Sequence, residues 1–290
     1  NQSDNAYYPA SLTTNSWSSG VNLTSNYEHK SLAVTNRETL LFIPKFNNPD
    51  WSMSAMGRFE MTSGNSTNQN IGHSGIPTGI NSSIADGYLT NSTSGTGQWR
   101  SASFLGSVHL AYLDGRYAFD LTVRRDGSTK FGKGNKWGTF PGISGRWNIS
   151  DEPFFVDSKF SNFISLLSFR PGWGRVGRQP GGEYLQYNKY GDYGIYGSNG
   201  SSITAIRPNN LRLTNIKWET TDSWNLGFNL NLLEDLIKMD LNIYHKKTKD
   251  LLMAGIGIPS SSGFGSLSWR NVGSMENKGW EFELGYKWNI

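Results

Sequence analysis

Two acidic residues, Glu281 and Glu283, could in principle form a catalytic pair. On one face of a strand, positions i and i+2 lie about 7 Å apart, within the loose range for the paired carboxylates of glycosidases. Both acids alternate with Trp280, Phe282 and Leu284, which places them on the polar face of that strand, where carboxylates are ordinary. Nothing nearby predicts the raised pKa that a general acid needs. We therefore assign no catalytic residue, and Asp151-Glu152 likewise reads as a pair of solvated turn acids.

Residues 172–177 match the GxGxxG pattern, which in dinucleotide-binding proteins forms a turn that lets the pyrophosphate approach the start of a helix. The residues that follow, 178–182, contain Pro180 and two glycines, so no helix is expected to begin there. The sequence favours a glycine-rich strand end and turn. GxSxG, HExxH and Walker A motifs are absent from the chain, and no cofactor is predicted.

No metal site is predicted either. Metal-ligand spacing is lacking among the four histidines, His29, His73, His109 and His245. His109 falls among the polar partners of Val108 and Leu110, which favours a role in a lumen or in packing. The oxygen-rich segments contain no EF-hand-like succession of acids, and the absence of cysteine excludes thiolate metal or redox chemistry.

A row of tyrosines is the best candidate for ligand binding, and its members are Tyr184, Tyr187, Tyr190, Tyr193 and Tyr196. A spacing of three fits neither a strand nor a sustained helix, and glycines interrupt the row. In an external loop the rings could stack on the apolar faces of sugars while their hydroxyls bond to a ligand or a partner protein. Alternatively, the rings pack the loop onto itself or join an interfacial aromatic girdle.

Strands with one apolar and one polar face must position these residues, because apolar and polar side chains alternate one for one in nine stretches. Strands of about ten residues with aromatic ends, separated by Gly, Asn and Ser, suit a β-barrel that crosses a bilayer with its apolar side outward. The residues predicted to face lipid are Trp224, Leu226, Phe228, Leu230, Ile237, Met239, Leu241, Ile243, Phe282 and Leu284.

The predicted strands lie near 31–43, 51–63, 99–113, 116–125, 137–149, 163–175, 214–232, 236–250 and 279–290. Short and long connections alternate between them, apart from the similar pair 126–136 and 150–162. Asp114-Gly115 is a hairpin dipeptide that supplies positive φ at little cost, and 233–235 is similarly tight. Outer-membrane barrels show this asymmetry, with short periplasmic turns and long extracellular loops. The segments expected to face outside are 1–30, 64–98, 176–213 and 251–278.

Composition agrees with a membrane barrel. The chain of 290 residues has 34 glycines and 13% aromatic residues but only 36% hydrophobic residues, so an ordered apolar pattern coexists with low hydropathy. No apolar run approaches the roughly 18 residues of a membrane helix, so any crossing must be made by strands. A net charge of +4 is too dilute to indicate a nucleic-acid partner.

Several stretches of the chain resemble the motifs of one protein family. They are Arg125-Asp126-Gly127-Ser128-Thr129-Lys130-Phe131-Gly132, Phe140-Pro141-Gly142, residues 145–155, 167–179, Lys217-Trp218-Glu219-Thr220-Thr221 with Trp224-Asn225-Leu226-Gly227, residues 244–252, and Asn271-Val272-Gly273-Ser274-Met275-Glu276-Asn277-Lys278-Gly279-Trp280-Glu281. Together, over residues 116–290, they are similar to consecutive signatures of the SusC/RagA family, the TonB-dependent outer-membrane transporters of Bacteroidetes. Residues 1–115 match only as generic barrel. One departure is Pro171, where the family usually has an aromatic-glycine strand without proline, which puts the strand pairing there in question.

The resemblance implies an antiparallel transmembrane β-barrel of about 22 strands with an N-terminal plug in its lumen. Residues 1–290 are then expected to be part of the barrel, about nine strands, without the plug, the TonB box or a signal peptide. In the family, a SusD-like surface lipoprotein closes over the extracellular mouth, and the TonB system acts through the plug to admit an oligosaccharide or a peptide. The resemblance therefore implies a non-enzymatic importer segment that is integral to the bacterial outer membrane and bounded by outer-membrane lipid.

A secreted β-sandwich that binds or cleaves glycans is the alternative, because its alternating faces would pack against a second sheet instead of lipid. Length and strand number allow either fold. The sequence favours the barrel, since its apolar face continues through aromatic strand ends and its connections segregate by length. A requirement for detergent separates the two.

Overall fold

The computed structural model describes residues 2–10, 22–76, 87–196 and 203–287, and for residues 195 and 196 it describes the backbone only. The chain divides into two compact units. Unit 1 comprises Asn1–Asn36 and Thr62–Arg100, and unit 2 comprises Arg37–Met61 and Ser101–Ile290. Among the described residues, no helix has the length and hydropathy to cross a membrane.

A ten-stranded sheet is the main element, and its strands follow one another in chain order. They are β1 (Gln2–Tyr8), β2 (Leu23–Phe42), β3 (Trp51–Ser74), β4 (Tyr88–Tyr112), β5 (Tyr117–Ser128), β6 (Trp137–Asn148), β7 (Ile164–Arg178), β10 (Glu219–Leu232), β11 (Ile237–Lys249) and β14 (Ser274–Tyr286). Two separate antiparallel hairpins are β8 (Tyr190–Tyr196) with β9 (Ile203–Pro208), and β12 (Leu252–Gly257) with β13 (Ser266–Asn271). The short helices are η3 (Ile149–Asp151), α1 (Pro153–Val156), η4 (Lys159–Asn162) and η5 (Ser260–Ser262). The predicted all-β, antiparallel architecture is confirmed.

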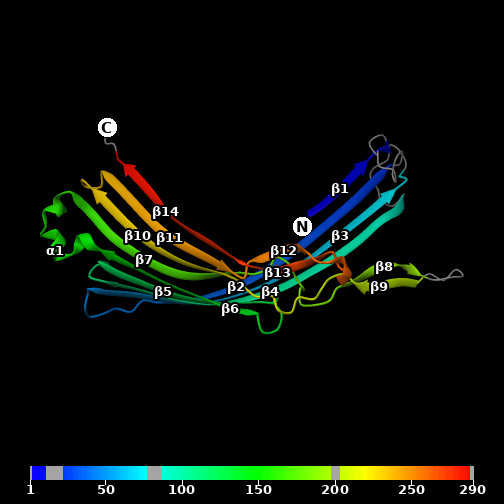
Figure 1. Cartoon of the computed structure of the whole chain (residues 1–290), viewed down its shortest axis with the longest axis horizontal. Helices are drawn as coiled ribbons and strands as arrows, with labels where there is room; N and C mark the ends of the chain where they lie inside the picture. The colour runs from blue at the N-terminus through cyan, green and yellow to red at the C-terminus, as the bar shows by residue number, and fades with distance from the viewer. Residues whose placement is uncertain (1, 11–21, 77–86, 197–202, 288–290) are drawn as a thin grey trace. The chain divides into compact units, whose positions relative to one another are not determined.

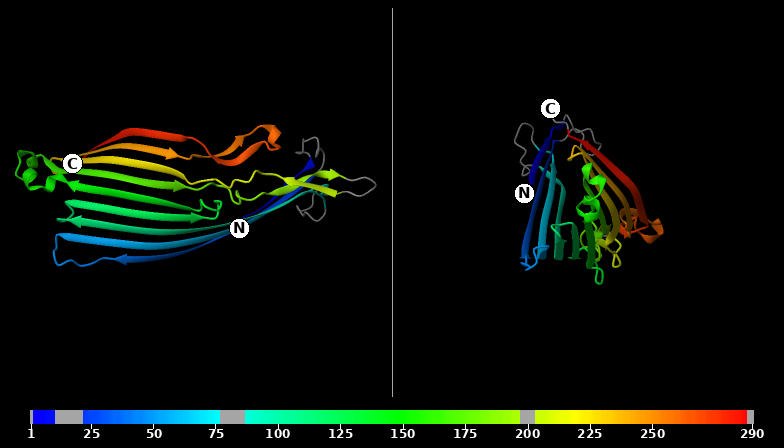
Figure 2. Two further views of the ribbon diagram at one scale, coloured as in Figure 1. Left: turned by 60° about the horizontal axis from the view of Figure 1, so that its bottom comes forward. Right: turned by 90° about the vertical axis from the view of Figure 1, so that its left-hand side faces the viewer.

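Connections at the two ends of the unit 2 strands differ in kind (Figure 1). One end, which we call the short-connection end, carries residues 113–116, 149–163 with α1, and 233–236. The opposite end, the long-loop end, carries 129–136, 179–218 and 250–273, with the hairpin of β12 and β13. Figure 2 shows β5, β6, β7, β10, β11 and β14 side by side between these ends.

The two predicted tight turns are confirmed and adopt the left-handed conformation. Leu113 and Asp114 have φ of 52° and 51°, ahead of Gly115 at 85°. Leu233, Glu234 and Asp235 do the same without any glycine, at 52°, 53° and 68°. Each turn is closed by a backbone hydrogen bond, from Arg116 N to Leu113 O at 3.0 Å in the first and from Leu236 N to Leu233 O at 3.1 Å in the second.

Several predicted loops are wrong, because they contain strands. Residues 1–30 hold β1 and the start of β2, residues 64–98 hold the end of β3 and the start of β4, residues 176–213 hold β8 and β9, and residues 251–278 hold β12, β13 and the start of β14. Beyond an apolar band both faces of a strand meet polar surroundings, so the alternation that marks a strand fades there. Conversely, residues 214–218, which were predicted as strand, lie outside β10.

In unit 1 the extended ends of β2, β3 and β4 are built from Ser, Thr, Asn and Gly, with buried polar groups that are satisfied locally. Asn22 is 7% exposed; its Nδ2 donates to Ile76 O at 2.7 Å, and its Oδ1 accepts from Ala10 N at 2.8 Å. The Thr24 hydroxyl donates to Ala6 O at 3.0 Å. These hydrogen bonds fix the ends of strands whose described side chains are mostly polar.

The strand register of unit 2 aligns apolar side chains into rows. One row holds Phe169, Phe228, Leu241 and Phe282, the next holds Leu167, Leu230, Met239 and Leu284, and a third holds Pro171, Leu226, Ile243 and Trp280. On β5 and β6, the same face carries Phe119, Leu121, Val123 and Ile143. We call these residues, with Tyr117, Trp147, Trp173, Trp224 and Ile237, the apolar face.

Pairing between β6 and β7 is interrupted at the proline. Fourteen positions of β7 pair with β10, but only five pair with β6, and the gap on β7 falls between Gly172 and Phe169, at Arg170 and Pro171. Proline has no N–H to give the ladder. A Cβ placed on Gly145 would lie 3.8 Å from Pro171 Cγ, in ordinary van der Waals contact, so the proline ring does not require a glycine on the neighbouring strand. The expected disturbance of pairing is therefore present on the β6 side only.

Candidate ligand-binding site

Apolar residues from three long connections form a small core at the long-loop end. Phe131 is fully buried, and Leu185, Ile216 and Leu252 are nearly so. Partly buried Leu213, Trp218 and Trp269 pack around them, and we call these seven residues the loop cluster. The rings of Phe131 and Trp218 stack with centroids 4.6 Å apart. The cluster ties segments 129–136, 179–218 and 250–271 to one another.

Polar side chains lock the same segments. The buried carboxylate of Glu219 accepts from Leu252 N at 2.7 Å. Asn271 clamps two backbones: its Oδ1 accepts from Lys217 N at 2.8 Å, and its Nδ2 donates to Lys217 O at 2.9 Å and to Asp250 O at 2.8 Å. The long-loop end is therefore a structured platform. The prediction of a strand over 214–218 was wrong because Ile216 and Trp218 pack into the loop cluster, so their alternation does not mark one face of a strand.

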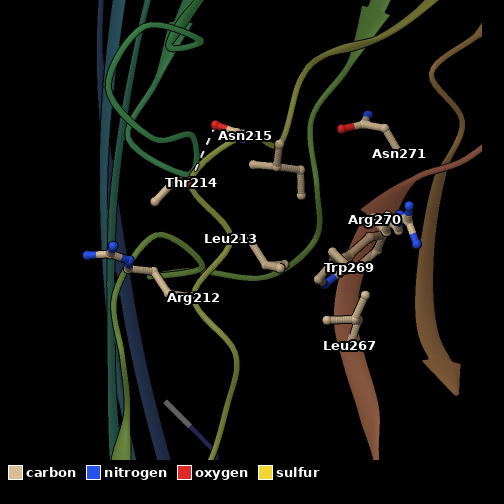
Figure 3. A pocket seen from close by; sticks show the side chains of 9 residues that line it. Arg212, Leu213, Thr214, Asn215, Leu267, Trp269, Arg270 and Asn271 are labelled. Atoms are coloured by element: carbon tan, nitrogen blue, oxygen red, sulfur yellow. Dashed lines mark hydrogen bonds between the residues drawn. The ribbon is translucent and has the colours of Figure 1, made fainter. Parts of the chain in front are cut away.

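A pocket of about 390 Å³ lies beside the loop cluster, and its lining residues are Arg212, Leu213, Thr214, Asn215, Ile216, Leu267, Trp269, Arg270 and Asn271. In Figure 3 the side chains of Leu213 and Trp269 point toward one another, while the guanidinium of Arg212 lies on the side away from Trp269. An indole beside amide and hydroxyl groups can take up a polar organic ligand with an apolar face. Sequence reasoning missed this pocket, because its two walls lie about fifty residues apart in the chain.

The described members of the tyrosine row differ in exposure. Tyr184 is half-buried, at a φ of 57°, with Lys189 Nζ 5.9 Å from the centre of its ring. Tyr187, Tyr190 and Tyr193 are about 60% exposed. The side chain of Tyr196 lies outside the described residues.

The prediction that a spacing of three excludes a strand is wrong for Tyr190–Tyr196, which is β8. The register with β9 shifts between Asp192 and Gly194, so Tyr193 is the extra residue of a bulge, and a bulge breaks the strict period of two. Arg207 lies over the Tyr193 ring at 3.7 Å from its centre. Three exposed rings on or beside one hairpin still offer stacking surfaces at the long-loop end.

Opposite the apolar face, the same strands carry a polar network. Arg170 donates to Asp240 Oδ2 at 2.7 Å, and Asn229 and Asn242 donate to the same carboxylate. The pair formed by Arg175 and Asp222, at 2.6 and 3.1 Å, instead alternates onto the side of Trp173 and Trp224, beyond the apolar rows. Glu283 stands in register with Asp240. Glu283 and Glu281, which is paired with Asn242, thus lie on the polar face, as the alternation predicted.

The other chemical motifs lie in ordinary surroundings. The GxGxxG pattern falls within β7, and among the described residues no helix follows it before β8. His109 Nδ1 lies 2.7 Å from Asp120 Oδ1 on the neighbouring strand, and His245 Nε2 lies 2.7 Å from Glu276 Oε1. Within the described ranges no three metal-ligating side chains converge.

Glu152, at the short-connection end, is not the solvated acid that the sequence predicted. It is 8% exposed, and its Oε1 accepts from the Tyr117 hydroxyl and, at 2.8 Å, from Trp147 Nε1. Arg116 approaches Oε2 at 3.5 Å. The hydrogen bond from Tyr117, followed by that from Trp147, holds the pKa of the Glu152 carboxyl below its usual range. The sequence signal was the proline that follows, which can start a helix with Glu152 at its N-cap.

All ten residues predicted to face lipid lie on the apolar face. Phe282 and Leu284 are 52% and 60% exposed, and none of Ile237, Met239 or Leu241 is among the buried residues. The large apolar side chains that are buried in unit 2 instead belong to the loop cluster, to Phe140 on the polar face, and to Phe155 in α1.

Comparisons with known proteins agree with this arrangement. The family model described as TonB dependent receptor-like, beta-barrel matches residues 1–290. The TonB-dependent receptor SusC of Bacteroides thetaiotaomicron is 35% identical over 189 residues, which are 64% of this chain and 18% of SusC. The TonB-dependent receptor P26 of Formosa agariphila is 35% identical over 206 residues, 70% of this chain and 20% of that protein. The chain thus spans about a fifth of the length of these relatives.

Among solved structures, the RagAB peptide transporter superposes with a TM-score of 0.83 at 18% identity, covering 97% of this chain and 30% of the matched chain. The RagAB peptide importer in its closed-closed state gives the same score over 99% of this chain. At this identity the likeness concerns the fold: a run of consecutive strands within a larger barrel.

Proposed function

The chain belongs to the TonB-dependent receptor-like β-barrel family, and on that premise we propose that the protein imports a glycan or peptide nutrient across the bacterial outer membrane. The resemblance to SusC that the sequence motifs indicated is confirmed, and the chain is an outer-membrane barrel segment. Its relatives are receptors and transporters, which supports a role without catalysis.

One observation carries the proposal. In a chain matched over its whole length by a receptor barrel, every predicted lipid-facing residue falls on one face of the sheet, with hydrogen-bonded polar side chains on the other. A sheet with this division suits a wall between hydrocarbon and a polar lumen. The short-connection end then faces the periplasm and the long-loop end faces the outside.

At the long-loop end, the pocket beside Trp269 and the exposed rings of Tyr187, Tyr190 and Tyr193 provide surfaces for ligand. Aromatic rings with nearby amides and hydroxyls suit sugars and peptides alike, because both combine apolar faces with many hydrogen-bonding groups. SusC-type membership supports a SusD-like lipoprotein as the extracellular partner and the TonB system as the energy source.

Removal of the gene tests the proposal. The deletion strain should lose uptake of one defined glycan or peptide class, and the full-length protein supplied in trans should restore it. The full-length protein, extracted in mild detergent, should bring down a surface lipoprotein that mass spectrometry identifies. Unchanged uptake of every glycan and peptide tested, together with no lipoprotein in the complex, contradicts the proposal. A protein that is soluble without detergent would favour the secreted β-sandwich instead.

A further inference from the structure

The connection between β6 and β7 exposes an unusual amount of apolar surface. Within ten residues, Phe154, Val156, Phe160 and Phe163 are 64%, 56%, 68% and 62% exposed. Only Phe155 among the large apolar residues of this stretch is buried. Clustered rings of this kind are unfavourable in water and mark a surface that another phase or molecule covers.

The segment is structured, so it presents these rings in fixed positions. Ser158 Oγ donates to Phe155 O at 2.6 Å and accepts from Phe160 N at 3.3 Å. Ser161 Oγ donates to Val156 O at 3.0 Å and to Ser158 O at 2.8 Å. These serine bonds join α1 to η4 and hold the exposed side chains in place.

The start of the segment lies on the apolar side of the sheet. Glu152, the N-cap of α1, accepts hydrogen bonds from Tyr117 and Trp147. Tyr117 pairs with Trp147, and both alternate onto the same face as Phe119, which is 41% exposed. The carboxylate can reach both donors only from that face. The exposed side chains of Phe154 and Val156 in α1 and of Phe160 in η4 therefore follow directly from an attachment point on the apolar side, at the short-connection end.

We propose that residues 153–163 form an interfacial anchor that inserts Phe154, Val156 and Phe160 into the periplasmic leaflet of the outer membrane. Aromatic and aliphatic side chains gain from the boundary between head groups and acyl chains, and exposed Lys159 supplies a cation at the level of the phosphates. Glu152 fixes the anchor to the wall, because its bonds reach a Tyr and a Trp at the end of the transmembrane strands. Lipid is favoured over a protein partner by this attachment to the apolar face.

Site-specific labelling in the full-length protein tests the anchor, since this chain contains no cysteine that would compete for the label. Phe154→Cys and Phe160→Cys variants would carry an environment-sensitive fluorophore in phosphatidylethanolamine–phosphatidylglycerol vesicles. Doxyl-labelled lipid and aqueous iodide would serve as quenchers. Leu241→Cys on the apolar face and Asn242→Cys on the polar face are the matched controls, and unsubstituted protein corrects for label elsewhere.

We expect blue-shifted emission from the fluorophore at positions 154 and 160. Doxyl lipid should quench it there by at least half as much as at position 241, and iodide should quench it little. Strong iodide quenching at both positions, with lipid quenching no greater than at position 242, overturns it. Protection from both quenchers also overturns it, because the segment would then be covered by protein. If one substitution prevents folding, the other position and Val156→Cys give the same readout.

Discussion

The apolar face and the loop cluster both consist of large apolar side chains, yet they solve the problem of burial differently. On the apolar face, Phe228 and Phe282 stay exposed and Phe169 is half-buried, and the backbone ladder holds them in register. In the loop cluster, Phe131 and Leu252 are buried against each other's segments. The first region depends on an apolar solvent around it, whereas the second carries its own core.

This difference has a thermodynamic meaning. In lipid, a side chain on the wall gains nothing from packing against its neighbours that hydrocarbon would not also supply, so register and hydrogen bonding dominate. In the water-exposed loop cluster, the hydrophobic effect and close packing dominate. The same substitution should therefore have unequal effects in the two regions.

The largest expected effect comes from Phe131→Ala. Emptying a fully buried ring position should cost about 3–5 kcal/mol of the loop cluster's stability. Hydrogen exchange should show lost protection in residues 129–136 and 250–257, while β10 and β11 keep theirs. The matched control is Phe228→Ala on the apolar face, which should leave exchange in the loop cluster unchanged. Equal hydrogen exchange in the loop cluster of the two variants would contradict the proposed difference between the two regions.

Leu241→Arg should destabilise the barrel by roughly 2–4 kcal/mol, if Leu241 lies near the bilayer midplane, because a guanidinium is placed in hydrocarbon. Asn242→Arg, one residue along on the polar face, should be tolerated. Reversible urea unfolding in lipid vesicles measures both. Equal losses at the two positions would argue against a lipid environment for the apolar face.

Glu152 joins the connection between β6 and β7 to Tyr117 and Trp147 on the apolar face, and its ionisation should affect the stability of this attachment. Its pKa in the folded protein is depressed, so the carboxylate contributes stability that is present above the unfolded pKa of about 4.3 and is lost as the pH falls through the folded value. Glu152→Gln should lower the Tm at pH 7 and flatten the fall in Tm between pH 5 and pH 3. A parallel acid dependence in both proteins would rule out this role.

The smallest expected effect concerns ligand. Tyr190→Ala and Tyr193→Ala should each weaken binding of the imported nutrient by about 0.5–1.5 kcal/mol, through lost stacking, without changing the Tm of the barrel. Isothermal titration with the purified full-length complex measures the affinity. Tyr286→Ala, which removes an equally exposed ring from β14, is the control and should bind normally. If both tyrosine variants bind the nutrient with unchanged affinity, the tyrosine row does not contact ligand, and its rings serve loop packing or contact with the lipoprotein instead.

Local patterns determined how much could be predicted from the sequence. Alternation located Leu226, Leu241 and Phe282 on one face, and the DG dipeptide located a hairpin, because both depend on neighbours one or two residues away. The strands of unit 1 lack that alternation, since Ser, Thr and Asn occupy both faces. The loop cluster could not be predicted, because Phe131, Ile216 and Leu252 meet only after distant segments fold together.

The candidate site divides in the same way. Exposed tyrosines were visible as a spacing, but the bulge at Tyr193 and the pocket between Leu213 and Trp269 depend on tertiary contacts. Glu152 looked solvated because its donors, Tyr117 and Trp147, belong to strands whose facing direction had to be known first.

Pro171 has a consequence for how the wall is assembled. With fourteen paired positions toward β10 and five toward β6, β7 is bound far more firmly to the strands that follow it than to those before it. We expect the join between β6 and β7 to form later, and to open more easily, than the join between β7 and β10, because fewer backbone pairings hold it.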